Sequence, residues 1–149
     1  MTASRSWVGW IGTALSLLGI VVALWLTIAH FTTPLTLACP DTGPINCAKV
    51  TTSSYSTILG VPVALLGLFY FLVMLPLQLP QSWKSTYGRL STMRLLWSLA
   101  GIIMIFWLIY VELFRLNAIC LYCSAVHLIT LAIFANTMVG TALKRRSEA

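Results

Sequence analysis

The sequence is poor in charged residues, and acidic ones are the scarcest. Nine Lys and Arg and three Asp and Glu make up only 8% of 149 residues, against about 25% in a typical soluble domain. Hydrophobic residues reach 59%, and the mean hydropathy is +0.93. This composition excludes an ordinary soluble protein and indicates a single integral membrane domain over residues 1–149. The net charge of +6 comes from few, scattered residues, which argues against nucleic acid as a partner.

Four apolar stretches are each long enough for the roughly 20 residues that a membrane-spanning helix needs. They cover residues 7–30, 57–79, 95–113 and 119–143. The sequence therefore predicts an all-α membrane protein, a bundle of four transmembrane helices with a long non-cytoplasmic loop between the first two. Small residues mark where helices can approach closely, among them Gly9, Gly12, Gly19, Gly60, Gly67, Ala100 and Gly101.

The basic residues are distributed unevenly between the two ends of this bundle. An even number of spans places both termini and residues 80–94 on one side, which holds Arg5, Lys84, Arg89, Arg94, Lys144, Arg145 and Arg146. The other side holds only Lys49 and Arg115. Since basic residues gather on the cytoplasmic side, we predict cytoplasmic termini in a multi-pass protein of the inner (plasma) membrane. All four cysteines then lie toward the non-cytoplasmic side, where disulfides persist.

Two of the cysteines form a CLYC motif, Cys120 to Cys123, at the head of the fourth apolar stretch. We expect both in the first turn of the helix, three residues apart and on one face. A helix N-terminus favours the reactive thiolate. The alternatives are a structural disulfide and half of a zinc site. We favour a redox role, with no metal, because a CxxC that opens a membrane helix has little structural purpose.

The other two cysteines, Cys39 and Cys47, flank a short polar loop with the sequence CPDTGPINC. One interpretation is a disulfide that only staples the loop. The other is a shuttle, in which one cysteine meets an external partner and the other attacks the CxxC. Exchange of this kind passes through a mixed disulfide and needs an accessible sulfur, which a loop outside the membrane can offer.

Polar side chains near the cysteines are candidates for assisting roles. His127 lies four residues beyond Cys123 on the same predicted face, where it could bond a quinone oxygen or assist proton transfer. The alternative is a packed polar residue between helices. Hydroxyl residues follow Cys47, and we expect Ser56 and Thr57 to cap the second helix.

The order and spacing of these residues resemble the vitamin K epoxide reductase family. The resemblance rests on a loop pair eight residues apart, a Ser after the second cysteine, an apolar span that opens with Gly, and a CxxC at the fourth helix. It covers the stretches Cys39 to Gly67 and Cys120 to Cys123, and the four-helix layout agrees across the chain.

The resemblance implies a role for each of five residues. Cys123 faces and reduces the quinone, and Cys120 is its partner. Cys47 attacks Cys120, and Cys39 exchanges with a thioredoxin-like protein. Ser53 places a hydroxyl near the quinone, so that Ser53, His127 and Cys123 are the expected quinone-binding residues.

Two departures from animal members bear on the substrate. The chain has His127 where they have a tyrosine, and Val63 where they have an asparagine. Both argue against epoxide reduction. We therefore expect a bacterial-type thiol-disulfide:quinone oxidoreductase that supports disulfide bond formation, with menaquinone or ubiquinone as acceptor. Because the chain ends at Ala149 without a fused thioredoxin-like domain, the expected partner is a separate periplasmic or extracytoplasmic oxidase.

Three alternatives differ from this expectation. The nearest is an animal-type reductase of vitamin K or its epoxide. A second bacterial family of quinone-coupled disulfide oxidases carries its CxxC in the first outer loop, the reverse of the order here. A small multidrug transporter needs a buried acid in a span. The only candidate is Glu112, next to Arg115 at the outer end of the third span, which we interpret as a residue of the membrane interface.

Overall fold

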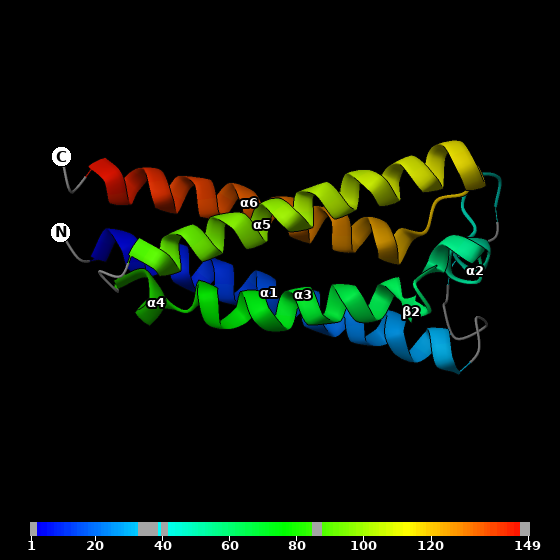
Figure 1. Ribbon diagram of the computed structural model, residues 1–149, viewed down its shortest axis with the longest axis horizontal. Coiled ribbons are helices and arrows are strands. Elements are labelled where there is room, and N and C mark those ends of the chain that lie inside the picture. The colour runs from blue at the N-terminus through cyan, green and yellow to red at the C-terminus, as the bar shows by residue number, and fades with distance from the viewer. Residues whose placement is uncertain (1–2, 33–38, 40–41, 85–87, 147–149) are drawn as a thin grey trace.

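The computed structural model describes residues 3–32, 39, 42–84 and 88–146, and most of them are helical. Four helices run alongside one another in alternating directions (Figure 1), and these are α1 (Ala3–Phe31), α3 (Val63–Gln78), α5 (Gly88–Tyr110) and α6 (Leu121–Arg146). A π-helix, η3 (Val111–Leu116), continues α5 directly. The alternation brings both ends of the chain to the same end of the bundle.

The shorter elements lie at the two ends of the bundle. At the end away from the termini, the connection from α1 to α3 contains α2 (Cys47–Thr51), the 3-10 turn η2 (Ser54–Ser56), and strands β1 (Thr57–Ile58) and β2 (Val61–Pro62). Leu59 and Gly60 join the two strands, and both have a positive φ (52° and 83°), as a type I′ hairpin turn requires. At the terminus end, α4 (Pro80–Lys84) joins α3 to α5.

The second helix is shorter than the sequence predicted. The hairpin occupies residues 57–62, so α3 begins at Val63 with Pro62 as its N-cap, and the expected capping by Ser56 and Thr57 is wrong. Pro76 lies inside α3, and the helix ends at Gln78, two residues before Pro80. Its 16 residues span about 24 Å, somewhat less than the apolar core of a bilayer.

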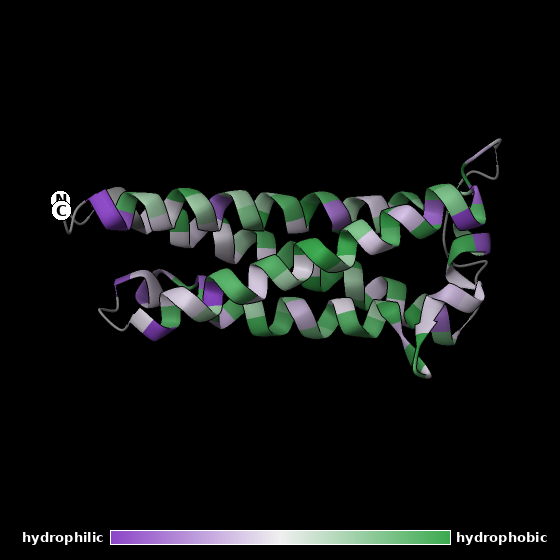
Figure 2. Cartoon of the chain, turned by 45° about the horizontal axis from the view of Figure 1, so that its top comes forward, coloured by the Kyte–Doolittle hydropathy of each residue, from purple (hydrophilic) through white to green (hydrophobic). Residues whose placement is uncertain are grey.

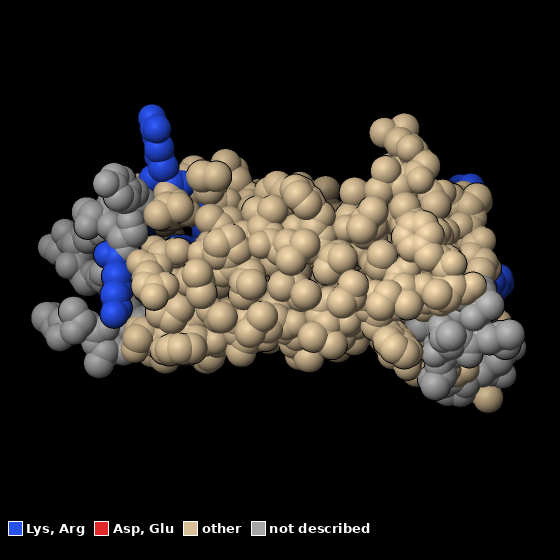
Figure 3. All heavy atoms as spheres, turned by 90° about the horizontal axis from the view of Figure 1, so that it is seen from below, with Lys and Arg blue, Asp and Glu red and all other residues tan. Residues whose placement is uncertain are grey.

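The other three helices are long and apolar enough to cross a membrane, over Ser6–Phe31, Gly88–Leu116 and Leu121–Arg146. Apolar residues dominate between the two ends of the bundle (Figure 2). Large hydrophobic side chains are exposed on every long helix, for example Trp10, Leu18, Leu72, Ile103, Phe106 and Leu128. Lys and Arg are visible only at the two ends of the face in Figure 3. This exposed apolar belt identifies an integral membrane protein.

The core of the bundle forms where α1 packs against α3 and α6. Phe71, Met74 and Ile133 are fully buried there. Gly19 permits this contact, because a Cβ at that position would overlap the ring of Phe71. The similar role expected of Gly67 is wrong, since nothing would lie within 4 Å of its Cβ.

Polar side chains tie the helices together near the termini. Arg94 was expected in a loop at the terminus end, but it is buried within α5. Its Nε donates to the Leu77 carbonyl at 2.8 Å. Its guanidinium lies 3.7 Å from the ring centre of Trp83. The Gln78 amide donates to the Thr137 hydroxyl at 2.8 Å. The Asn136 amide donates to the Val8 carbonyl at 3.0 Å, which links α6 to α1. All four long helices are therefore joined at this end.

The contact between Gly19 and Phe71 can be tested by a single methyl group. We expect Gly19→Ala to lower the free energy of unfolding by about 1–3 kcal/mol, because the buried ring has little space to move aside. Thermal unfolding of the purified protein in detergent measures this. Gly88→Ala is the matched control, since nothing lies within 4 Å of that position. Equal stability of the two variants would contradict the close contact.

Candidate active site

The loop that carries Cys47 is hydrogen-bonded to the segment that precedes α6. The Ile119 amide donates to the Pro44 carbonyl (2.8 Å), and the Asn46 amide donates to the Ile119 carbonyl (3.1 Å). Asn46 also caps α2, because its side-chain oxygen accepts from the Lys49 amide at 2.7 Å. Two short pieces of chain, distant in sequence, thus run side by side. Each leads directly into a cysteine, Cys47 on one and Cys120 on the other.

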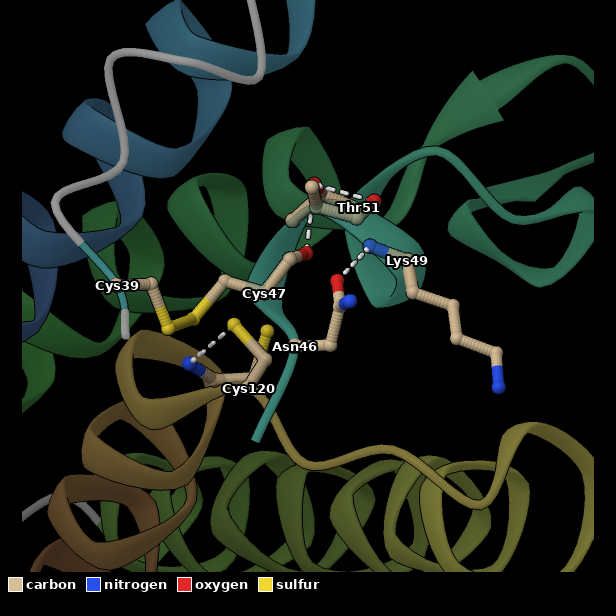
Figure 4. The surroundings of a disulfide bond; sticks show 8 residues. Cys39, Asn46, Cys47, Lys49, Thr51 and Cys120 are labelled. Carbon is tan, nitrogen blue, oxygen red and sulfur yellow. Dashed lines mark hydrogen bonds between the residues drawn. A yellow bond between two sulfur atoms is a disulfide. The ribbon is translucent and has the colours of Figure 1, made fainter. Parts of the chain in front are cut away.

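This pairing gathers the four cysteines at one end of the bundle. Cys39 and Cys47 form a disulfide with 6.0 Å between their Cα atoms, while Cys120 and Cys123 are free thiols. Cys120 lies beside the disulfide (Figure 4). Cys47 and Cys120 are 1% and 0% exposed and belong to one packed cluster. Cys39 is half-buried, so it is the sulfur of the disulfide that a partner can reach more easily.

Cys120 and Cys123 have different positions relative to α6. The helix begins at Leu121, so Cys120 precedes the first turn, in contrast to the expectation that both cysteines lie within it. The Cys120 sulfur accepts from the Cys123 amide at 3.3 Å, as an N-cap side chain does. A hydrogen bond from the Cys123 side chain, supported by that amide, lowers the pKa of Cys120 below its ordinary value, although burial opposes the shift.

An apolar cavity of about 320 Å³ lies next to the cysteines. Cys123, Ser53 and His127 all line it, and so does Val63. His127 is 5% exposed. The three residues expected to meet a quinone thus border one cavity, whereas Cys120 faces the disulfide. The volume is within the range of small-molecule sites, roughly 300–1,000 Å³.

The hydroxyl groups around the cavity differ in how they are engaged. The Ser53 hydroxyl donates to the Val50 carbonyl at 2.9 Å, so its oxygen remains free to accept but its proton is used. Tyr70 also lines the cavity, and its buried hydroxyl has no hydrogen-bond partner among the described residues. Sequence reasoning missed Tyr70, because one aromatic residue in an apolar helix carries no signal of such a position.

Glu112 is a second residue whose position differs from the expectation. It is only 6% exposed and lines the same cavity as Cys123 and His127, so its interpretation as a residue of the membrane interface is wrong. One signal was present in the sequence, since Glu112 is the only acidic residue within the predicted spans.

The alternative of a zinc half-site gains no further ligands from the fold. Within the described ranges, no three His, Cys, Asp or Glu side chains are grouped so that they could hold a metal ion. Glu112 and His127 border the cavity together with Cys123 but do not form such a group with it.

Cysteines gathered at the end of an apolar helix bundle, beside an apolar cavity, are typical of membrane proteins that carry out thiol redox chemistry. A model of the Vitamin K epoxide reductase family matches residues 10–138, and the chain belongs to that family. Its members are membrane oxidoreductases that couple disulfide chemistry to quinones. No curated protein matches the chain.

The pKa of Cys120 provides a test of the N-cap geometry. In a variant with Cys39 and Cys47 replaced by Ser, the rate of alkylation is measured against pH after Cys123→Ser and after Cys123→Ala. Serine at position 123 keeps a side-chain hydrogen-bond donor for the Cys120 thiolate, whereas alanine has none. The pH midpoint of Cys120 alkylation should therefore be lower in the serine variant than in the alanine variant. Both midpoints at the usual thiol value of about 8.5 would contradict the geometry.

Proposed function

We propose that this protein is a thiol-disulfide:quinone oxidoreductase that reoxidises a thioredoxin-like partner and so supports disulfide bond formation. The proposal rests on how the four sulfurs are arranged between the outside of the bundle and the cavity. The loop disulfide is reachable at Cys39, its other sulfur is packed with Cys120, and Cys123 lines the cavity. Electrons entering at the loop therefore have a short path to the cavity.

The first step is exchange between the partner and the loop. A thiolate of the partner's dithiol attacks Cys39, which breaks the Cys39–Cys47 bond and forms a mixed disulfide. The partner's second thiol then attacks that bond and releases Cys39. The partner leaves with a disulfide, and the loop holds two thiols. Its half-buried position makes Cys39 the better target, because Cys47 is enclosed by the packed cluster.

The second step passes the electron pair inward. When Cys120 and Cys123 are joined by a disulfide, the Cys47 thiolate attacks Cys120 and frees Cys123. Cys39 then attacks Cys47, which restores the loop disulfide and leaves both CxxC thiols reduced. The cysteine pairing seen here, with the loop oxidised and the CxxC reduced, corresponds to the state that follows this step. The low pKa of Cys120 suits it as the leaving thiolate, since lower-pKa thiols leave faster.

The third step takes place at the cavity. Cys120 and Cys123 become a disulfide, and a quinone gains their two electrons and two protons. The apolar lining suits a lipid-soluble ring, and the chemistry of the donor set fits menaquinone or ubiquinone equally. His127 borders the cavity as a possible donor to a quinone oxygen. The Ser53 hydroxyl can accept a hydrogen bond from the quinol, and it can donate one to a quinone oxygen once its bond to the Val50 carbonyl breaks.

The orientation proposed from the sequence fits the distribution of charge. Lys84, Arg89, Lys144, Arg145 and Arg146 belong to α4, α5 and α6 at the terminus end of the bundle, and Lys49 and Arg115 belong to α2 and η3 at the cysteine end. The side chain of Arg5 lies outside the described part of the chain. Cytoplasmic termini in the plasma membrane would place the cysteines on the extracytoplasmic side, where a separate thioredoxin-like oxidase can meet Cys39.

Changing the electron donor tests the proposed relay, which is the transfer of electrons from the Cys39–Cys47 pair to the Cys120–Cys123 pair. With a reduced thioredoxin-like protein as donor, Cys39→Ser and Cys47→Ser should lose nearly all quinone reduction, because the loop is the only route in. With dithiothreitol they should keep much of it, since this small thiol can reach the half-buried Cys123 directly. Anaerobic reduction of a soluble quinone by the purified protein is followed by absorbance.

Cys120→Ser and Cys123→Ser are the matched comparison in the same assay. Both should lose activity with either donor, because neither variant can form the CxxC disulfide. The relay would be wrong if loop variants and CxxC variants lost the same share of activity with both donors.

The orientation has its own test. In intact cells, after mild reduction, a membrane-impermeant thiol reagent should modify Cys39 from outside, because the basic residues favour a cytoplasmic position for the other end. Cys39→Ser identifies the labelled site. If the reagent modifies Cys39 only in inverted membrane vesicles, then the cysteines face the cytoplasm. That result would contradict the proposed orientation and the proposed role in disulfide formation.

A further inference from the structure

Glu112 lies at the point where the third long helix ends and the chain turns toward the CxxC. Its carbonyl accepts the amides of Asn117 and Ala118, the second at 3.1 Å. These bonds close the π-helix η3, and Asn117 takes a left-handed conformation (φ 46°). Such π-helical turns are rare and often occur at functional sites. The turn leads the chain back within a few residues to Cys120, beside the Glu112 side chain.

The carboxyl group of Glu112 contacts both parts of the CxxC. It lies close enough to the Cys120 amide and to the Cys123 thiol to interact with both. It also borders the cavity that Cys123 faces. A carboxyl group at 6% exposure within an apolar bundle is costly, and no Lys or Arg among the described residues lines this cavity to offset that cost. The contact with a reacting sulfur offers a functional reason for its presence.

We propose that Glu112 is a catalytic residue, the group that carries the proton of Cys123 during quinone reduction. This inference rests on the proposed function. In the overall reaction, Cys120 and Cys123 lose two protons and two electrons and become joined by a disulfide, and the quinone becomes a quinol. Glu112 takes one proton from the Cys123 thiol as the thiolate forms. It releases that proton into the cavity as the quinol forms, so the carboxylate is regenerated.

A base in this position addresses a problem set by the surroundings of Cys123. The sulfur is half-buried beside an apolar cavity, so a nearby proton acceptor shortens the path of its proton. Intramolecular proton transfer to a touching carboxylate avoids the solvent. His127 borders the same cavity from α6 and is the competing proton carrier. Among the described residues, the other titratable side chains that line the cavity are His30 on α1, Tyr55 on η2 and Tyr70 on α3.

The test compares Glu112→Gln with Glu148→Gln, which makes the same chemical change outside the described residues. Dithiothreitol is the donor and a soluble ubiquinone analogue the acceptor, under anaerobic conditions between about pH 5.5 and 8, with the non-enzymatic rate subtracted. We expect Glu112→Gln to lower kcat by about 100-fold or more and to lose the acid limb of the wild-type pH profile. Glu112→Asp should restore part of the rate. Glu148→Gln should match the wild type.

Each outcome has a separate meaning. A wild type that reduces no quinone rejects the proposed function itself. A wild type that is active, with the same rate and pH profile as Glu112→Gln, overturns the role of Glu112. If the acid limb is lost in His127→Gln and kept in Glu112→Gln, then His127 carries the proton, and the proposed role of Glu112 is overturned. Thermal unfolding and the Cys39–Cys47 disulfide report folding. A Glu112→Gln protein that is slow but keeps the wild-type pH profile reduces Glu112 to a structural role and rejects the proposal.

Discussion

The arrangement of the four cysteines depends on two backbone hydrogen bonds, which join Pro44 and Asn46 to Ile119. They hold an extramembrane loop against the segment that enters α6. Since each strand of this small pairing leads directly into a cysteine, the register of the backbone determines which sulfurs can meet. Side-chain packing alone would specify that register less strictly, because backbone hydrogen bonds are directional and apolar packing is not. Cys47 and Cys120 are consequently buried together, while Cys39 stays accessible and Cys123 faces the cavity.

The two ends of the bundle solve different physical problems. Near the termini, Arg94, Gln78 and Asn136 make hydrogen bonds between helices, so that the bundle is tied where no chemistry is proposed. At the other end, polar and reactive groups surround a cavity. The low charge content of the chain makes each buried ionisable group conspicuous. Glu112 beside the CxxC is one such group, and its cost in an apolar setting argues for a use.

The membrane character, the positions of three long helices and the grouping of cysteines in two pairs were predictable from the sequence. These features rest on local properties, namely apolar length and residue spacing. Ser53, His127 and Cys123, which the family resemblance implies as quinone-binding residues, border one cavity. The start of α3 was not predictable, because apolar residues such as Ile58 and Val61 favour a hairpin as readily as a helix. The positive φ of Leu59, which makes the hairpin turn, has no signature in the sequence.

The sequence by itself determined that this chain is a membrane protein with two cysteine pairs suited to redox exchange, because composition and spacing act over a few residues. Only the tertiary structure decided which sulfur lies against which, that Cys120 caps α6 rather than sharing its first turn, and that Glu112 faces the cavity instead of the membrane interface. Those outcomes depend on contacts between segments far apart in the chain. Ile119 and the 44–46 loop are far apart in the sequence, and no local pattern encodes their hydrogen bonds.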